Sequence, residues 1–485
     1  MSAPPLATPL VRALLLTGLC VAAIGAPPAC LLSTGGLPGG ACGDGLRAAE
    51  EACDGDDLGG ETCAGLGLGE GELRCTAECT PDVSACGVKN TCGDGVIAGG
   101  EACDGKDLGG EDCQSLGHLG GALACSAQCQ RDESGCLDAP GDWLDVAWAR
   151  RRTLTVQRAK VAEPISPFAL LVEITEVGLG AAKADGGDLV FTAADGKTVL
   201  PHEIERFTGS PPTLVAWVAV DAISPDVDTV LYLYYENPLA APKPPAGVWD
   251  ASYAGVYHLG EAVSSGADGG LHLDATGQGR DGTQHGNGPV TGKIGTGQRF
   301  GGKGEYIDLA HPEQFALGDA DCSISAWINT SSKKSMGIVL KSKALVHEPG
   351  DKLFGLNHDA DKLGQDQGWV DYLSGTSKVD DGLWHHVVWT QKKDDSGEEE
   401  RWTLYVDGAA ESDKLATTKL DVPGHTLRVG WHADGSYFDE PFDGIIDELQ
   451  LSAVTRSPGW VLTTFQNQRK PSEFVAVGPE ESLPK

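Results

Sequence analysis

The chain has 485 residues and a formal net charge of −34, which is spread along its length rather than gathered in a tail. This acidity excludes the classes of protein that need a basic patch, above all nucleic-acid binding, and it disfavours adhesion to anionic lipid. Glycine is abundant (67 residues) and methionine nearly absent (2), and with many alternating runs that contain Thr, Val and Trp this composition predicts β structure with many turns.

The start of the chain has the features of an export signal. Arg12 is the only positively charged side chain before an apolar run. The run is shorter than the roughly 20 apolar residues that span a bilayer, and no later segment is long and apolar enough to do so. Cys20 and Cys30 leave a lipid anchor open as an alternative. We expect a signal peptide over 1–26, a linker over 27–41, and a secreted or cell-surface location.

Two stretches carry six cysteines each, separated by 11, 10, 12, 4 and 7 positions in both. Their few large apolar residues do not suffice for a hydrophobic core, so we expect disulfides to hold repeats over 42–86 and 92–136. Zinc is the competing use of clustered cysteines, but the pattern has no Cys-x-x-Cys pair and the signal peptide favours an oxidising compartment. The connectivity stays open. The twelve cysteines are Cys42, Cys53, Cys63, Cys75, Cys79, Cys86, Cys92, Cys103, Cys113, Cys125, Cys129 and Cys136.

Each repeat also contains an acidic loop, at 54–57 and at 104–107, that bears a slight likeness to a calcium loop. Lys106 breaks the pattern in the second copy, so solvated turns are the better interpretation. With their common opening (CGDG, then EACDG and two further cysteines), the repeats resemble a cysteine-rich repeat common in secreted proteins of myxobacteria and their relatives. The resemblance implies an extracellular stalk or spacer without a catalytic role.

From Trp143 the sequence changes to short β-type runs separated by turn residues. Asp195-Gly196 between two such runs is a good hairpin signal. Five or more strands at this spacing predict a β-sandwich over 143–240. The runs are Leu154–Val156, Ala169–Val172, Asp188–Phe191, Leu214–Val218 and Val230–Tyr234.

One polar cluster stands out in this segment, around Glu203 and Glu205. In a strand the two side chains share a face, and paired carboxylates are the groups that glycoside hydrolysis requires. The plainer interpretation, which we favour, has two solvent-facing glutamates around a buried Ile204.

Several motifs of the same segment recur in a known family. They are Trp148, Arg151-Arg152, residues 183–191, Leu200-Pro201 with Glu203 to Glu205, Ala216–Val218 and Tyr234–Pro238. In these residues the segment resembles a bacterial domain family of uncharacterised function that usually precedes lectin-like jelly rolls. The resemblance implies architecture more than activity.

After a proline-rich link, strict alternation of apolar and polar residues predicts a second sandwich. Cys322 has no partner in the repeats, so we expect it to be a small buried hydrophobe, with a bridge to Cys30 as the alternative. The alternating runs are Glu305–Leu309, Cys322–Ile328, Trp384–Trp389, Trp402–Val406, Leu427–Trp431 and Ile445–Leu451.

Short motifs of this segment also occur in order in a known fold. They are Tyr257–Leu259, Asp274–Thr283, Ile324–Trp327, Gly382–Val387, Leu404–Gly408, Phe442–Glu448 and Arg456 to Trp460. Together they resemble the concanavalin-like, laminin-G-like jelly roll, which we place at 251–475 with a flexible tail over 476–485. Members of that family are mostly binding modules for glycans or proteins, often with one bound Ca²⁺.

The resemblance implies a Ca²⁺ ion near Asp274 and Asp447, with Asp443 as a further ligand, because carboxylate oxygens suit this hard cation. The alternative is that Asp447 caps a turn or pairs locally. His385 and His386 are adjacent in a predicted strand and therefore point to opposite faces. We expect one packed and one exposed histidine here rather than a metal site.

The predicted fold class is mainly β, with disulfide-rich repeats followed by two β-sandwiches. Related glycoside hydrolases carry glutamates alternating on one strand, and the nearest string here, residues 445–449, lacks the first and the last of them. We therefore predict a non-catalytic exported protein that binds glycans or surface and matrix proteins through Trp431, Tyr437 and Phe438. A structural spacer or assembly component of the cell surface is the alternative, and a glycoside hydrolase is a third.

Overall fold

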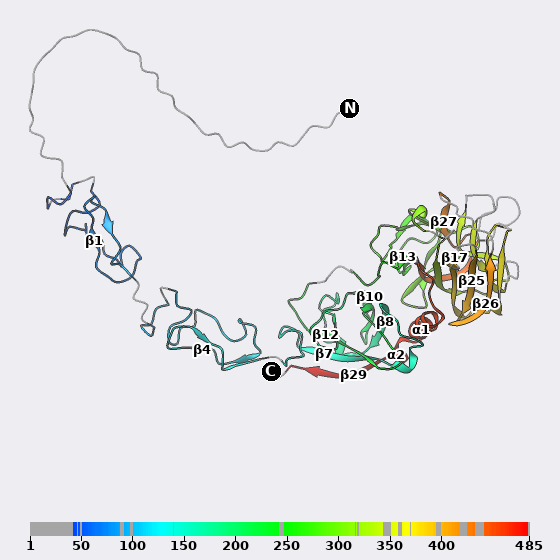
Figure 1. The fold of residues 1–485 in the computed structure, drawn as a ribbon, viewed down its shortest axis with the longest axis horizontal. Coiled ribbons are helices and arrows are strands. Elements are labelled where there is room, and N and C mark those ends of the chain that lie inside the picture. Colours follow the sequence, from blue (N-terminus) through cyan, green and yellow to red (C-terminus); the bar gives the residue numbers. More distant parts are fainter. Residues whose placement is uncertain are drawn as a thin grey trace, which may run out of the picture. The chain divides into compact units, whose positions relative to one another are not determined.

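The computed structural model describes residues 42–45, 47–48, 51–87, 92–97, 100–138, 140–241, 247–315, 317, 320–342, 351–356, 361–368, 370–393, 399–416, 424–431 and 441–483. The chain divides into two compact units: residues up to Gly109 together with Cys125–Arg131 form the first, and Gly110–Ala124 together with the residues from Asp132 onward form the second. Figure 1 shows the fold, coloured along the sequence. The predicted signal peptide and linker lie outside the described residues. Within the described residues, no helix is long and apolar enough to cross a membrane.

All twelve cysteines of the two repeats form disulfides, as predicted. Each repeat joins its first cysteine to its fifth, its second to its fourth and its third to its sixth. The bonds are Cys42–Cys79, Cys53–Cys75 and Cys63–Cys86 in the first repeat, and Cys92–Cys129, Cys103–Cys125 and Cys113–Cys136 in the second. Apart from isolated bridges, the strands in the described residues of the repeats are β1 (Arg74–Cys75), β2 (Pro81–Asp82), β3 (Gly120–Gly121), β4 (Ala124–Cys125), β5 (Arg131–Asp132) and β6 (Cys136–Leu137).

The acidic loops of the repeats are turns with exposed residues at 55–57 and 105–107, as predicted, but the first aspartate of each loop is buried. Asp54 is 1 % exposed and accepts a backbone hydrogen bond from Gly43 at 3.0 Å. Asp104 is 3 % exposed and accepts from Gly93 at 2.9 Å and from Gly95 at 3.2 Å. A carboxylate that accepts backbone N–H groups fixes a loop that has no secondary structure of its own. In each repeat the buried aspartate, Asp54 or Asp104, therefore fixes the backbone of the CGDG segment that opens the repeat.

The first sandwich packs a four-stranded sheet, in the order β29–β7–β12–β9, against a three-stranded sheet, β10–β11–β8. Strands β8 and β11 are apolar along nearly their whole length because both of their faces are covered. The elements are β7 (Arg150–Val156), η1 (Arg158–Lys160), β8 (Phe168–Thr175), η2 (Val177–Ala181), β9 (Val190–Ala193), β10 (His202–Thr208), β11 (Thr213–Val220), β12 (Thr229–Tyr235) and β29 (Val475–Ser482).

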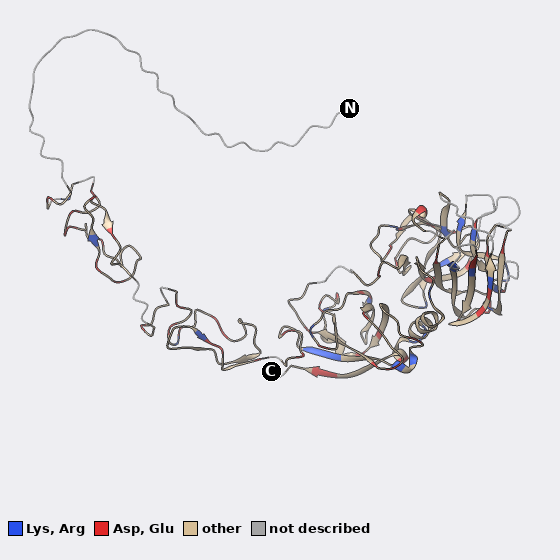
Figure 2. Ribbon diagram, viewed as in Figure 1, with Lys and Arg blue, Asp and Glu red and all other residues tan. Residues whose placement is uncertain are grey.

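The C-terminal residues return to the first sandwich, so the prediction of a flexible tail over 476–485 is wrong for residues 476–482. They form β29, which pairs antiparallel with β7 over a register that includes Glu481 opposite Arg151. Figure 2 shows the basic strand β7 beside the acidic strand β29. Since 330 residues separate Arg151 from Glu481, the jelly roll is inserted between strands of the first sandwich. Tail composition alone did not reveal this pairing.

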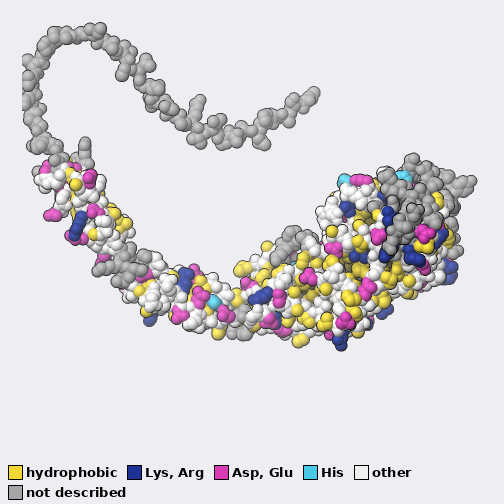
Figure 3. All heavy atoms as spheres, in the orientation of Figure 1, with side chains coloured by type: hydrophobic (Ala, Val, Ile, Leu, Met, Phe, Trp, Pro, Cys, Tyr) yellow, Lys and Arg dark blue, Asp and Glu magenta, His cyan; other side chains and the backbone are white. Residues whose placement is uncertain are grey.

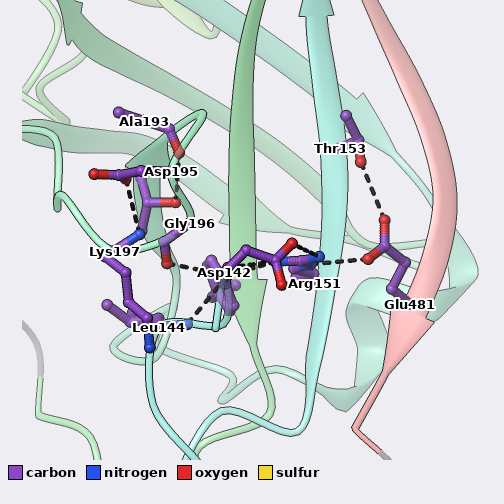
Figure 4. A network of polar contacts seen from close by, with 11 residues as sticks. Asp142, Leu144, Arg151, Thr153, Ala193, Asp195, Gly196, Lys197 and Glu481 are labelled. Atoms are coloured by element: carbon purple, nitrogen blue, oxygen red, sulfur yellow. Dashed lines mark hydrogen bonds and ion pairs between the residues drawn. The ribbon is translucent and has the colours of Figure 1, made fainter. Parts of the chain in front are cut away.

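Arg151 fastens β29 to the first sandwich (Figure 4). Its guanidinium donates to Glu481 Oε2 at 2.9 Å, to Asp142 Oδ2 at 2.8 Å and to Tyr234 Oη at 3.0 Å. It also lies over the ring of Tyr232, 4.2 Å from the centroid. Burial alone would lower the pKa of Arg151, but these hydrogen bonds outweigh it and raise the pKa, so the charge is permanent.

The second sandwich packs two eight-stranded sheets. One has the order β16–β17–β28–β19–β24–β25–β26, with β13 also on β28; the other has the order β14–β15–β18–β27–β20–β21–β22–β23. Cys322 begins a central strand, is 1 % exposed and carries a free thiol, as predicted. The strands are β13 (Tyr253–Tyr257), β14 (Asp268–His272), β15 (Gly282–His285), β16 (Gly288–Thr291), β17 (Thr296–Gly301), β18 (Tyr306–Leu309), β19 (Cys322–Asn329), β20 (Met336–Ser342), β21 (Lys352–Leu356), β22 (Lys362–Asp366), β23 (Tyr372–Lys378), β24 (Trp384–Lys393), β25 (Glu400–Val406), β26 (Ala409–Ala416), β27 (Thr426–Val429) and β28 (Asp443–Ser452), with η3 at Pro312–Gln314.

The hydrophobic core of the first sandwich extends into its interface with the second. Buried residues of the first sandwich form one continuous cluster with Tyr253, Val256 and Ile294 of the second. Helix α1 (Pro458–Arg469) leads from β28 toward the short α2 (Pro471–Phe474) and contributes Trp460 to the same cluster. This interface positions the first candidate site.

Candidate functional site

Five ionisable residues meet where the sandwiches touch, and we call them the interdomain cluster. Glu203 and Glu205 come from β10 of the first sandwich, while His258 follows β13 and Asp447 and Glu448 lie in β28 of the second. Glu203, Asp447 and Glu448 are at most 8 % exposed. Four carboxylates and one imidazole therefore share a largely dry environment, in which charge interactions are strong.

His258 links the two sandwiches through both ring nitrogens. Its Nε2 lies 2.8 Å from Glu203 Oε1, and its Nδ1 lies 3.0 and 2.9 Å from the two oxygens of Glu448. Both nitrogens face carboxylate oxygens, so the protonated ring can donate from both sides. Burial alone would lower the pKa of His258, but the charge of Glu448 and the hydrogen bond to Glu203 outweigh it and raise the pKa well above its ordinary value.

The two glutamates of β10 each accept an indole N–H. Trp249 donates to Glu203 Oε1 at 2.9 Å, and Trp217 donates to Glu205 Oε2 at 3.0 Å. The other oxygen of Glu205, Oε1, is buried and accepts no hydrogen bond. It lies against Gly295, where a Cβ would come within 2.3 Å of it. Burial raises the pKa of Glu205, and nearby His258 and the Trp217 hydrogen bond counteract this only in part.

Asp447 and Glu448 differ in how the backbone supports them. Asp447 Oδ2 accepts the N–H groups of Lys293 and Ile294 at 2.7 and 2.9 Å, both from the hairpin between β16 and β17. Burial raises the pKa of Asp447 well above its ordinary value, and the charge of Glu448 adds to this. Burial also raises the pKa of Glu448 to about 8, against the attraction of His258.

The favoured interpretation of Glu203 and Glu205 as solvent-facing side chains is wrong. Glu203 is only 8 % exposed, and Ile204, which follows it, is less buried than Glu203. The physical reason is that a second domain covers this face of β10. A strand that is half polar in sequence looks solvent-exposed when its covering domain lies 50 or more residues away along the chain, as His258 does.

The three aspartates expected to bind Ca²⁺ do not form one ligand set among the described residues. Asp274 accepts from the backbone of Val256 and from Thr276, while Asp443 pairs with Arg299 at 2.9 Å. Asp447 accepts hydrogen bonds from backbone N–H groups, which fits the alternative that it pairs locally. These donor sets fit three separate structural roles, and calcium binding stays a prediction.

A second candidate site lies on the outer face of the second sandwich, and we call it the aromatic ladder: His285, Tyr306, Arg428 and Trp431. The His285 and Tyr306 rings stack with centroids 4.2 Å apart, and Trp431 follows 4.6 Å from Tyr306. Arg428 lies over both Tyr306 and Trp431, at 4.6 and 5.0 Å from their centroids. Asp308 holds Arg428 through a 2.7 Å hydrogen bond.

Strand alternation places the ladder outside the core. Ile307, Leu427 and Val429 are buried between the sheets, so Tyr306 and Arg428, which alternate with them, point away from the core. Each member of the ladder is half-buried rather than enclosed. The His285 and Tyr306 rings are nearly parallel, at 14°, whereas the Trp431 ring is tilted by 39° from Tyr306, and the positive charge of Arg428 lies over the last two rings.

Of the predicted ligand-binding aromatics, Trp431 lies in the ladder, and Tyr437 and Phe438 lie outside the described residues. The adjacent histidines of β24 follow the prediction only in part. His386 is packed, at 1 % exposure, but His385 is half-buried and pairs with Asp407 at 2.8 Å.

Comparison with known proteins supports the two-sandwich description. Residues 300–462 match the family described as the concanavalin A-like lectin/glucanases superfamily, in its Laminin_G_3 branch. Residues 185–248 match a domain of unknown function, DUF2341. The second sandwich is thus a concanavalin-like domain, and the chain also carries a DUF2341 domain and a disulfide-bonded N-terminal region. Among curated proteins, none matches the chain.

Solved structures with a similar fold are distant. Domain 4 of AbnA, an extracellular GH43 arabinanase from Geobacillus stearothermophilus solved with arabinotriose, is 18 % identical, with a TM-score of 0.35 over 45 % of this chain and 100 % of that one. The binding domain of Paraclostridial Mosquitocidal Protein 1 is 14 % identical, with a TM-score of 0.33 over 44 % and 52 %. Trypanosoma rangeli sialidase is 17 % identical, with a TM-score of 0.34 over 52 % and 42 % when bound to the inhibitor DANA. At these scores the resemblance carries no argument about activity.

Sequence reasoning singled out Glu203, Glu205, Asp447 and Trp431 but missed the other residues of the two sites. His258 and Glu448 were visible only as parts of jelly-roll motifs, with no functional role attached. His285 and Tyr306 had no signal of their own, because their pairing depends on the register of β15 and β18. The usable signal was the alternation of Tyr306 and Asp308 with apolar residues in one short strand.

Proposed function

We propose that this is an exported, non-catalytic protein that binds glycans through the aromatic ladder of its concanavalin-like domain. The observation that carries the proposal is the row of half-buried rings of His285, Tyr306 and Trp431 on the outer face of a sheet, with Arg428 over the last two. Sugar rings have apolar faces that pack on aromatic rings and hydroxyl groups that hydrogen-bond to charged side chains, so a surface of this composition suits them.

Charge and compartment support the same function. The chain is strongly acidic, and Figure 3 shows acidic and basic side chains interspersed over the visible face of the sandwiches. A neutral glycan is not repelled by such a surface, whereas a polyanion is. Six disulfides in the repeats fit an oxidising, extracellular setting.

The catalytic alternative has less support. Glu203 and Glu205 are the paired carboxylates of the chain, but they hydrogen-bond to Trp249 and Trp217 inside the domain interface. Hydrolysis of a glycan needs both carboxylates beside the substrate. At the ladder, which is the surface we assign to ligands, the neighbouring carboxylate is Asp308, and it pairs with Arg428.

The test is a broad glycan array probed with the full secreted chain, in Ca²⁺ and in EDTA. We expect binding to a defined glycan class, and at least a tenfold loss of affinity in Tyr306→Ala and in Trp431→Ala. Trp384→Ala is the matched control, because Trp384 is a half-buried aromatic at the start of β24 in the other sheet. Binding that survives both ladder variants contradicts the assignment of the site, and the absence of any glycan ligand favours a structural spacer or a protein ligand.

A further inference from the structure

The interdomain cluster contains a carboxylate oxygen with no partner. Asp447 is satisfied by backbone N–H groups, and Glu203 by Trp249 and His258. Glu205 accepts from Trp217 with one oxygen only, and its Oε1 is buried without a hydrogen bond. A buried, unpaired carboxylate oxygen is costly unless a cation takes the place of the missing donor.

Two further residues with ligand atoms lie beside Glu205. Glu205, His258 and Glu448 each bring one ligand atom within 4.8 Å of the others. His258 Nδ1 lies 2.9 Å from Glu448 Oε2. In a tetrahedral zinc site with ligands about 2.1 Å from the ion, neighbouring ligand atoms lie about 3.4 Å apart, so these two atoms move apart slightly when they share one ion. With the carboxylate of Glu205, the two residues make a set of three possible ligands.

The neighbours of His258 have the arrangement of a metal site's outer shell. Metal-bound histidines usually donate their second ring N–H to a carboxylate, which fixes the tautomer and the orientation of the ring. Here Glu203 Oε1 lies 2.8 Å from His258 Nε2, and Trp249 in turn donates to the same oxygen at 2.9 Å. With Nε2 held in this way, Nδ1 is the nitrogen that faces Glu448 and is free to exchange its proton for a metal.

We propose that Glu205, Glu448 and His258 Nδ1 bind one first-row transition-metal ion, such as Zn²⁺ or Mn²⁺, between the two sandwiches. Two carboxylates and an imidazole suit these metals, whereas Ca²⁺ prefers oxygen ligands throughout. Binding displaces the proton that Nδ1 donates to Glu448, and the ion then bridges ligands from both domains. Its role is to fasten the DUF2341 segment to the concanavalin-like domain, and this inference is independent of the proposed glycan site.

The experiment is calorimetric titration of the full, EDTA-treated chain with Zn²⁺, with Co²⁺ absorption as a second probe of ligand type. We expect one equivalent to bind with release of a proton, and the interface to melt at a higher temperature when metal is present. In Glu205→Gln the affinity is expected to fall at least 100-fold and the metal-dependent rise in melting temperature to vanish. In Glu203→Gln, which alters only the outer shell, the loss is expected to be 10- to 100-fold.

Glu261→Gln is the matched control, because it removes a carboxylate from another glutamate–histidine pair, with His272 at 2.9 Å, in the same sandwich. It is expected to bind metal like the unaltered chain. Circular dichroism in EDTA establishes that each variant is folded before metal is added. The proposal is overturned if Zn²⁺ fails to bind the unaltered chain, if Glu205→Gln binds it equally well, or if Ca²⁺ alone binds and stabilises the interface.

Discussion

The side-chain amide of Asn467 hydrogen-bonds to the backbone of Leu171 at the free edge of β8. Asn467 Oδ1 accepts the Leu171 N–H at 2.8 Å, and its Nδ2 donates to the Leu171 carbonyl at 2.9 Å. Strand β8 is the last strand of its sheet, so without this contact both groups would be buried and unpaired. Helix α1 thereby acts as one more neighbour for the sheet of the first sandwich.

Replacing Asn467 with Ala is expected to lower the free energy of unfolding by about 1–3 kcal/mol, because a buried N–H and a buried carbonyl lose their partners. Urea unfolding monitored by tryptophan fluorescence measures the effect. Gln466→Ala is the control, since Gln466 is half-buried on the same helix. Equal destabilisation by the two variants would show that helix propensity, and not the pairing with β8, accounts for the loss.

Arg151→Met tests how β29 is held. The variant keeps an apolar stem between the rings of Trp143 and Tyr232, which lie 4.5 and 4.2 Å from the guanidinium carbon. It removes the hydrogen bonds to Glu481 and Asp142. We expect a loss of about 1.5–3 kcal/mol, the range for hydrogen bonds to charged groups.

Hydrogen exchange locates that effect. Amides of β29 are expected to exchange faster in Arg151→Met, while those of the central jelly-roll strand β19 keep their protection. The exposed Arg158, which donates to the Asp226 carbonyl, gives the control Arg158→Met. Unchanged exchange in β29 would mean that its backbone pairing with β7 suffices without the side-chain network.

Reduction of the disulfides is expected to unfold the repeats and leave the sandwiches intact. All 11 tryptophans lie at or after Trp143, so tryptophan fluorescence reports only the sandwiches. With a reductant, we expect proteolysis within 42–136 and an unchanged fluorescence melting curve, because each lost disulfide costs the repeats about 2–4 kcal/mol. The chain without reductant is the control. A fluorescence transition that shifts on reduction would contradict this independence.

The sequence predicted the parts of this chain better than the contacts between them. The cysteine spacing and the alternation of β-type residues are local signals, and the repeats and both sandwiches follow from them. The return of Val475–Ser482 to β7 and the meeting of Glu203 with His258 depend on long-range packing. Neither leaves a local pattern in the sequence. The segment that forms an edge strand looks like an ordinary tail, and the strand face that the second domain covers looks like ordinary surface.

The aromatic ladder shows the same limit. Tyr306 and His285 form a site because β15 and β18 pair in one register, with these residues directly opposite. A shift by one residue would turn one of them into the core. Composition and alternation predicted a strand around Tyr306, but the register that makes it a binding surface comes from the fold.

His386 makes stability depend on pH. It is buried 5.2 Å from the Trp327 ring and 6.2 Å from the Phe465 ring, and burial lowers its pKa to about 4. In the unfolded chain its pKa is about 6.5. Between these pH values His386 binds a proton in the unfolded state but not in the folded state. Stability is therefore full above about pH 6.5 and falls by about 3 kcal/mol as the pH drops to 4.

Substituting Phe for His386 removes this proton uptake and keeps the ring between its aromatic neighbours, so the acid loss of stability is expected to shrink. Its neighbour His385 is the matched control with the opposite sign. A hydrogen bond to Asp407 raises the pKa of His385 in the folded state. The contribution of His385 to stability is therefore fully present below its unfolded-state pKa and is lost as the pH rises through its folded-state pKa. His385→Gln is therefore expected to lose stability mainly at low pH. Urea unfolding between pH 4 and 8 compares the three chains, and parallel pH profiles for His386→Phe and the unaltered chain would contradict the assignment.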